Sequence, residues 1–287
     1  MAFLDQNPAL GYPIAAGLGL LVGSFLNVVI LRLPRRLDWE WKRDARDYLE
    51  MPNDMYDPPP PGIVVEPSHC PHCQHRLSWY ENIPVFSWLA LRGRCRNCKT
   101  PISAQYPAVE LLTMLLVLAS VWRFGFGWQG FGASLVSCFL VAGAGIDLRT
   151  KLLPDQITLW LMWLGLIASV DNLFIPAKAA IAGAVLGYGS LWSVNWLFKQ
   201  VRGKTGMGDG DFKLLAALGA WAGYKALLPI VLISSVTGAI LQTILMRVRK
   251  DDGDAYFPFG PYIAIAGWIV FLFGEQIMGA YLGLFPH

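Results

Sequence analysis

The sequence predicts an all-α polytopic membrane protein of about eight transmembrane helices, with a small cytoplasmic zinc-binding module between the first and the second. The first observation is composition, because 55% of the residues are hydrophobic and only 15% are charged. The second is a series of long apolar runs, rich in the Trp and Gly residues that suit helices packed in lipid. The third is a pair of CxxC motifs in the one long polar segment. A net charge of +3 is too small to indicate a nucleic-acid partner.

The apolar runs predict the membrane spans, since about 17 to 25 apolar residues cross a bilayer as a helix. The first run ends in a basic cluster and lacks a small-residue cleavage site, so we interpret it as a span and not as a signal peptide. The run at 212–224 is short for a full crossing. The approximate spans are residues 11–32, 105–122, 128–146, 156–174, 177–198, 212–224, 226–246 and 257–283.

The distribution of Lys and Arg predicts the orientation, because these residues are retained on the cytoplasmic side. If the N-terminus is outside, only Arg123, Lys178 and Lys225 of the 23 basic residues fall in external loops. The chain then has three parts. They are a first transmembrane helix at 1–32, a cytoplasmic segment at 33–104 and a transmembrane domain at 105–287.

Four of the five cysteines form the two CxxC pairs, and these predict a structural zinc site. Each CxxC turn directs two sulfurs at one ion, and four thiolates complete its tetrahedral shell. Two disulfides are the alternative, which a reducing cytoplasm disfavours. The predicted ligands are Cys70, Cys73, Cys95 and Cys98, with His69, His72 and His75 close enough in sequence to substitute for one of them.

Two aspartates stand at the ends of apolar runs, where a carboxylate is costly unless it is solvated or used. Asp147 follows the run at 128–146, and Asp211 lies in the glycine-rich stretch GMGDGDF. Each alone is explained as the solvated end of a helix. Two carboxylates brought close together share a proton, so that one activates water while the other polarises a carbonyl. We therefore expect an aspartyl active site.

The GDGD sequence leaves open which aspartate belongs to that pair, because Asp209 and Asp211 both fit a G-x-G-D pattern. We expect Asp209 to be the N-cap of a helix that begins at Asp211. Asp155, directly after a proline, is expected to begin the fourth span. A solvated loop without the spacing of a calcium-binding loop is expected around Asp251, Asp252 and Asp254.

These motifs together resemble a known family over nearly the whole chain. They are GSFLNVVILRLP at 23–34, the CPHC and CRNC pairs, IDLRTKLLPD, GMGDGDFKLLAALGAW, and FPFGPY at 257–262. The family that they resemble is the bacterial type IV prepilin leader peptidases. The resemblance implies that Asp147 and Asp211 are the catalytic pair, because Phe212 and Lys213 follow Asp211 as in the family pattern. Asp209 departs from that pattern, which usually has an uncharged residue there.

The resemblance implies a bifunctional enzyme of the bacterial inner membrane, for which the distribution of Lys and Arg predicts a periplasmic N-terminus. Such an enzyme removes the leaders of prepilins, and of the pseudopilins of type II secretion, at the cytoplasmic face. It then N-methylates the new N-terminal residue with S-adenosylmethionine as the donor. No motif identifies the donor site, and Glu81 and Asn82 are candidates for methyl transfer only as polar residues of the cytoplasmic segment, where a loop-packing role is equally expected.

Two other functions remain open from the residues. A peptidase without methyl transfer is disfavoured because the bifunctional relatives carry the four cysteines. A transporter would use the two aspartates as a proton relay, but the chain lacks two related halves with paired interrupted helices.

Overall fold

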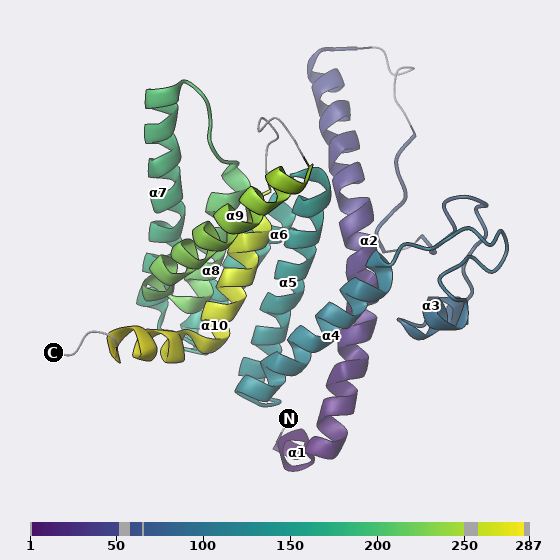
Figure 1. Cartoon of the computed structure of the whole chain (residues 1–287), viewed down its shortest axis with the longest axis horizontal. Helices are drawn as coiled ribbons and strands as arrows, with labels where there is room; N and C mark the ends of the chain where they lie inside the picture. The colour runs from purple at the N-terminus through teal and green to yellow at the C-terminus, as the bar shows by residue number, and fades with distance from the viewer. Residues whose placement is uncertain (1, 52–57, 65, 250–257, 284–287) are drawn as a thin grey trace. The chain divides into compact units, whose positions relative to one another are not determined.

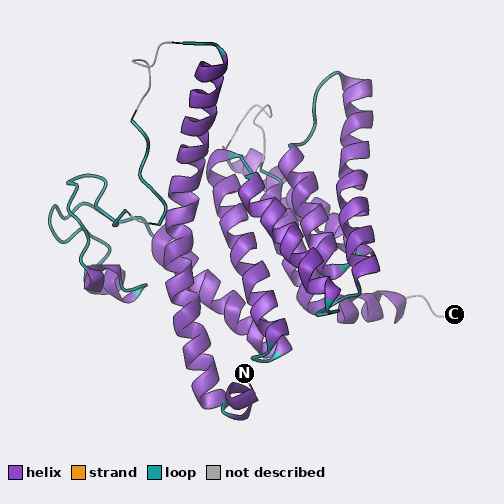
Figure 2. Cartoon of the chain, turned by 180° about the vertical axis from the view of Figure 1, so that it is seen from behind, coloured by secondary structure: helices purple, strands orange, loops and turns teal. Residues whose placement is uncertain are grey.

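The computed structural model describes residues 2–51, 58–64, 66–249 and 258–283. Within these ranges the chain is helical, and only isolated β-bridges occur, both in the cysteine-containing segment (Figure 2). The predicted loop with Asp251, Asp252 and Asp254 lies outside the described residues.

Each of the eight predicted spans coincides with a helix. These helices are α2 (Pro8–Tyr48), α4 (Gln105–Phe124), α5 (Trp128–Thr150), α6 (Asp155–Val170), α7 (Ala177–Arg202), α8 (Asp209–Ala222), α9 (Leu227–Arg249) and α10 (Gly260–Gly283). The shorter elements are α1 (Ala2–Gln6), η2 (Trp79–Asn82), α3 (Phe86–Ala90) and η3 (Tyr224–Ala226).

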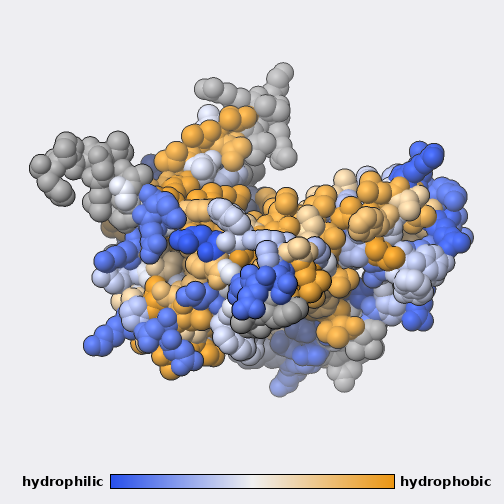
Figure 3. All heavy atoms as spheres, turned by 90° about the horizontal axis from the view of Figure 1, so that it is seen from below, coloured by the Kyte–Doolittle hydropathy of each residue, from blue (hydrophilic) through white to orange (hydrophobic). Residues whose placement is uncertain are grey.

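Five helical segments in the described part are long and apolar enough to cross a membrane, and they involve α2, α4, α5, α9 and α10. α6 has 16 residues and α8 has 14, whereas a crossing needs about 20. The chain is thus an all-helical membrane protein, and the count of eight crossings is not confirmed. The helices expose many large hydrophobic side chains, which suits contact with lipid, and the face seen in Figure 3 shows hydrophobic areas next to hydrophilic ones.

The chain divides into two compact units, residues 1–119 and 120–287. In the first unit, α2 and the start of α4 pack closely through small residues. A Cβ added to Gly19 or Gly23 would lie 2.8 or 2.7 Å from a Cα atom of α4, and one turn further on Asn27 donates from Nδ2 to the Tyr106 carbonyl at 3.0 Å. α2 continues beyond its predicted end at residue 32 as one helix to Tyr48.

The second unit is built around α8. Every residue from Asp211 to Trp221 except Lys213 is buried, and α8 contacts α6, α7 and α10 (Figure 1). Its closest approach is to α7, where a Cβ added to Gly183 would lie 2.1 Å from the Gly219 carbonyl oxygen. A helix of this length spans about 21 Å. Because other helices surround it, α8 forms the core on which the candidate site is built.

Candidate active site and metal site

Asp147 lies in the last turn of α5, and its residue surface is only 5% exposed. Its carboxylate oxygen Oδ2 accepts the backbone N–H of Gly260, the first residue of α10, at 3.0 Å. The first N–H groups of a helix lack partners within it and carry partial positive charge, so they bind anions. A Cβ on Gly260 would lie 2.6 Å from the same oxygen, so a larger residue here would displace the carboxylate.

Asp211 lies in the first turn of α8 and is also 5% exposed. The charge of Asp147 acts on Asp211, so the fold brings the two predicted carboxylates into one buried site. The C-terminal end of α5 and the N-terminal ends of α8 and α10 therefore form the candidate active site.

The segments that follow the first aspartate and surround the second are in direct contact. A Cβ on Gly210 would lie 2.6 Å from Cβ of Leu153, so the two backbones approach closely here. The Lys213 ammonium lies 2.5 Å from Oδ1 of Asp155. α6 begins at Asp155, as predicted, and the ion pair gives this residue a second role that the sequence did not indicate.

The glycine-rich loop before α8 is held by a residue that sequence reasoning missed. Oδ1 of Asn195 in α7 accepts the N–H groups of Gly206 and Met207 at 2.9 and 3.2 Å. Gly206 also packs against the Phe198 ring, which lies 2.9 Å from where its Cβ would be. Asn195 is the one amide side chain in the run 177–198, and that was its only sequence signal.

The prediction that Asp209 is an N-cap is wrong. α8 begins at Asp209, and the N-cap is Gly208 with φ −77° and ψ 149°. The helix starts two residues earlier than expected, so Asp209 and Gly210 belong to its first turn. Glycine at position 210 allows this turn to pack closely against Leu153. Asp209 is exposed, while Asp211 is buried.

The four predicted zinc ligands form one cluster in the first unit. Their Sγ atoms all lie within 4.8 Å of one another, and the cluster found among the described residues contains no histidine. Two separations are 3.8 Å, between Cys70 and Cys98, and 3.9 Å, between Cys73 and Cys95. Zn–S bonds of about 2.3 Å in a tetrahedron place the sulfurs about 3.8 Å apart, so the residues fit the ion. All five cysteines are free, which contradicts the disulfide alternative.

The two CxxC turns have the same backbone pattern. Cys70 donates its N–H to the His75 carbonyl at 2.9 Å, and Cys95 donates to the Thr100 carbonyl at 2.8 Å. Hydrogen bonding with the Thr100 hydroxyl lowers the pKa of Cys98 to about 6. A thiol that ionises below neutral pH is suited to metal binding, because thiolate is the form that ligates.

The Glu81 carboxylate is held by contacts with Ser78 and His75. Its Oε2 accepts the Ser78 backbone N–H at 2.8 Å and lies 3.3 Å from Nε2 of His75. The Ser78 hydrogen bond is the main reason that the pKa of Glu81 is lowered. Together Ser78 and Glu81 form a capping box at the start of η2. A role for Glu81 or Asn82 in methyl transfer stays a prediction.

Two family models match this sequence. The bacterial peptidase A24 N-terminal domain matches residues 18–124, and the type IV leader peptidase family matches residues 134–243. A prepilin leader peptidase/N-methyltransferase from Xanthomonas campestris pv. campestris is 66% identical over 98% of both chains. The chain belongs to the type IV leader peptidase family.

Two more relatives of this chain support the assignment to the family. Proteins with the same name from Stutzerimonas stutzeri and Neisseria gonorrhoeae are 50% and 43% identical over 98% of this chain and 96% of theirs. No solved structure matches the sequence. The resemblance inferred from the motifs is thus confirmed. Asp147 and Asp211 lie in the segment matched by the leader peptidase model, and the four cysteines lie in the segment matched by the N-terminal domain model.

Proposed function

We propose that this protein removes the leader peptides of type IV prepilins and pseudopilins and then N-methylates the new N-terminal residue. The observation that carries the peptidase activity is the buried site in which Asp147 and Asp211 interact. The methyltransferase activity is supported by relatives named prepilin leader peptidase/N-methyltransferase, up to 66% identical over nearly the whole chain. The same names favour this function over a peptidase without methyl transfer and over a transporter.

The two aspartates have different environments, and we infer their roles in hydrolysis from this difference. Asp147 accepts the Gly260 N–H, which stabilises the ionised carboxylate. Asp147 therefore takes a proton from water as the general base. Protonated Asp211 donates a hydrogen bond to the scissile carbonyl, and the proton held by Asp147 then passes to the leaving amine. No covalent intermediate with the enzyme is formed.

Methyl transfer requires a neutral amine on the trimmed pilin, because the lone pair of its nitrogen attacks the methyl group. S-adenosylmethionine supplies that electrophilic methyl group. A shared proton between carboxylates has no role in this reaction, so the two activities need not use the same residues.

We propose that four thiolates, from Cys70, Cys73, Cys95 and Cys98, hold one structural zinc ion. The support is the separation of their sulfurs and the chemistry of a closed four-thiolate shell, which contributes folding energy and leaves no open position for catalysis.

The proposed location is the bacterial inner membrane, with eight crossings and a periplasmic N-terminus. The charge asymmetry supports this orientation, and the helices that coincide with the eight predicted spans support the count. The zinc module within 33–104 and the loops beside both aspartates would then face the cytoplasm, and 105–287 would form the peptidase domain.

The decisive experiment incubates the purified full-length protein with a prepilin and labelled S-adenosylmethionine. Mass spectrometry should show a pilin that has lost its leader and gained one N-terminal methyl group. The Asp147→Asn protein is the matched control and should leave the prepilin intact. A wild-type protein that binds prepilin but releases no leader would overturn the peptidase proposal, and cleavage without label transfer would support the peptidase-only alternative.

A further inference from the structure

The loop between η2 and α3 contains a strained turn. Val85 has φ 61° and ψ −51°, and the Phe86 N–H donates to the Pro84 carbonyl at 2.6 Å. This is the γ-turn with a positive φ, which is rare and unfavourable for a β-branched residue. Such a conformation persists only where surrounding contacts hold it.

A buried carboxylate on a membrane helix holds this turn. Glu110 of α4 is 6% exposed, and its Oε2 accepts the Val85 N–H at 2.7 Å. Glu110 is five residues after the first residue of α4, which corresponds to about 8 Å along the helix axis. Since α4 is long and apolar enough to cross a membrane, the turn is attached near the start of a candidate span.

The chain leading into the cysteine module is attached to α2 at Arg32, about 14 Å along that helix from Gly23, which packs on Glu110. Arg32, the last residue of the first predicted span, donates to the carbonyl oxygens of Gly62 and Glu66 at 2.6 and 3.0 Å. It also donates to the Pro67 carbonyl at 3.3 Å. The module therefore begins beside one membrane helix, is attached at Val85 to a second, and ends where that second helix starts.

The residues on both sides of the strained turn present large apolar side chains to the outside. We call residues 79–90, which comprise η2, the strained turn and α3, the interfacial hairpin. Trp79, Phe86 and Leu89 are 81%, 65% and 59% exposed. An apolar patch of this kind marks a surface that contacts lipid or protein. In the turns of α4 that follow Glu110, Leu111, Leu112 and Leu115 are also exposed.

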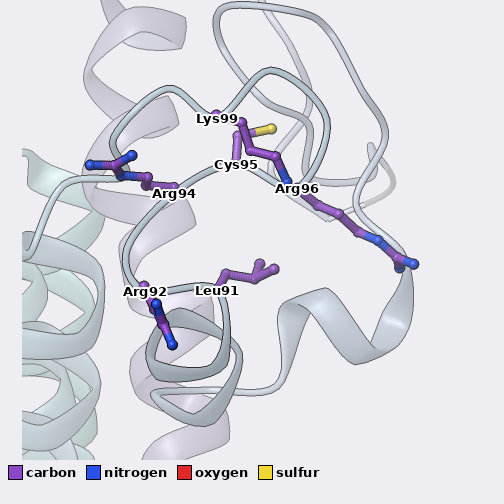
Figure 4. A pocket seen from close by; sticks show the side chains of 6 residues that line it. All are labelled: Leu91, Arg92, Arg94, Cys95, Arg96 and Lys99. Carbon is purple, nitrogen blue, oxygen red and sulfur yellow. The ribbon is translucent and has the colours of Figure 1, made fainter.

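A cationic loop follows the interfacial hairpin. Arg92, Arg94, Arg96 and Lys99, with Leu91 and Cys95, line a pocket of about 350 Å³. Figure 4 shows that the guanidinium groups of Arg94 and Arg96 point to opposite sides of the loop, so they suit several separate anions better than one small ligand. Arg96 also lies over the Tyr80 ring, 5.4 Å from its centroid, which connects the loop to the hairpin.

Acidic groups do not offset this charge. Glu81 is the one acidic residue in the sequence from 67 to 104, and it is buried. Exposed cations beside exposed aromatic residues are the pattern of a helix or loop that lies at the surface of a membrane with anionic lipids.

We propose that the interfacial hairpin inserts Trp79, Phe86 and Leu89 among the phospholipid headgroups, while the cationic loop contacts the phosphates of anionic lipids. The Glu110 carboxylate is the positioning group that holds the hairpin at this depth. The cysteine module is then a membrane-surface element fixed to the bilayer. The inference depends on the embedding of α4 and not on the assignment of the aspartates.

Photo-crosslinking of the full-length protein in lipid nanodiscs tests the insertion. Phe86→p-benzoylphenylalanine should form phospholipid adducts at several times the yield of the matched Tyr48→p-benzoylphenylalanine protein. Tyr48 is 88% exposed and lies 16 residues beyond Arg32 on α2, about 24 Å further along the helix. Equal adduct yields at the two positions, or adducts of Phe86 with protein alone, would overturn the insertion.

The Glu110 contact has its own test with the same crosslinker at Phe86. Glu110→Ala removes the acceptor of the Val85 N–H, so lipid adducts should fall several-fold and hydrogen exchange of residues 83–86 should increase. Glu110→Gln retains an acceptor oxygen and should restore both. Unchanged adducts in the Ala protein would show that the carboxylate does not set the depth.

Hydrogen exchange of residues 91–99 tests the headgroup contact. Exchange should be slower in nanodiscs with phosphatidylglycerol than in pure phosphatidylcholine. The Arg92→Gln/Arg94→Gln/Arg96→Gln protein should lose this difference, and the control Lys199→Gln/Arg202→Gln protein, changed at the end of α7, should retain it. An equal effect of soluble glycerophosphate in phosphatidylcholine nanodiscs, or no effect of phosphatidylglycerol, would overturn the lipid assignment.

Discussion

Gly260 donates its backbone N–H to the carboxylate of Asp147 across 113 residues of sequence. The bond joins the first residue of α10 to the last turn of α5, and it leaves no room for a side chain at position 260. The last helix is thus part of the candidate active site, because its N-terminus orients one of the two aspartates.

Gly260→Ala should reduce leader cleavage on the order of 100-fold. The added methyl group would push the Asp147 carboxylate away, and a displacement of about 1 Å at a catalytic group has an effect of that size. The initial rate of prepilin cleavage measures it. Gly189→Ala on α7 is the control, since its added Cβ would meet no atom within 4 Å apart from its chain neighbours and the nearby backbone of its own helix. Equal rates for the two proteins would contradict the role of Gly260.

Asp147→Asn and Asp211→Asn should each abolish leader cleavage, whereas Asp209→Asn should retain most of it. An amide neither shares a proton nor accepts one from water, and loss of general acid–base catalysis alone costs on the order of 10² to 10⁴-fold in rate. Exposed Asp209 affects only the charge at the start of α8, about 0.3–1 kcal/mol. Normal cleavage by Asp211→Asn would refute the assignment.

Metal analysis of the purified protein should find one zinc ion per chain. Replacement of Cys70 or Cys95 by Ser should remove the ion and increase protease sensitivity of the cysteine module, because a closed site contributes folding energy. Cys138→Ser is the matched control, since this residue lies in α5 and outside the cluster. A protein that retains zinc without Cys95 would require another ligand.

The two activities should separate by mutation. Asp147→Asn should still transfer a labelled methyl group to a pilin supplied already trimmed, because hydrolysis needs the carboxylate pair and methylation does not. The substitution is nearly isosteric, and zinc content checks that the protein is folded. A folded Asp147→Asn protein that transfers no label would place methyl transfer among the membrane helices.

Cysteine labelling in intact cells should confirm the orientation. Single cysteines introduced at Pro60 and Lys204 should not react with a reagent that cannot cross the membrane, and Gly127→Cys should react. The prediction follows from the location of Lys and Arg. Labelling at both 60 and 204 would reverse the topology and place the cysteines in an oxidising compartment.

The sequence by itself determined the features that depend on local pattern. The apolar runs predicted the helices because a buried or lipid-facing helix needs a continuous apolar surface. The CxxC spacing predicted the cluster of Cys70, Cys73, Cys95 and Cys98, because a four-residue turn brings both sulfurs of a pair to the same side. The proximity of Asp147 and Asp211 was expected because a buried carboxylate needs a partner or a use.

Only the tertiary structure decided which distant groups meet. The bonds of Gly260 to Asp147, of Asn195 to the glycine-rich loop and of Glu110 to Val85 join segments 11 to 113 residues apart. The start of α8 was also misplaced, because Gly210 belongs to that helix where it packs against Leu153. Local propensity could not show these contacts, since each depends on the three-dimensional packing of helices and loops that no single segment contains.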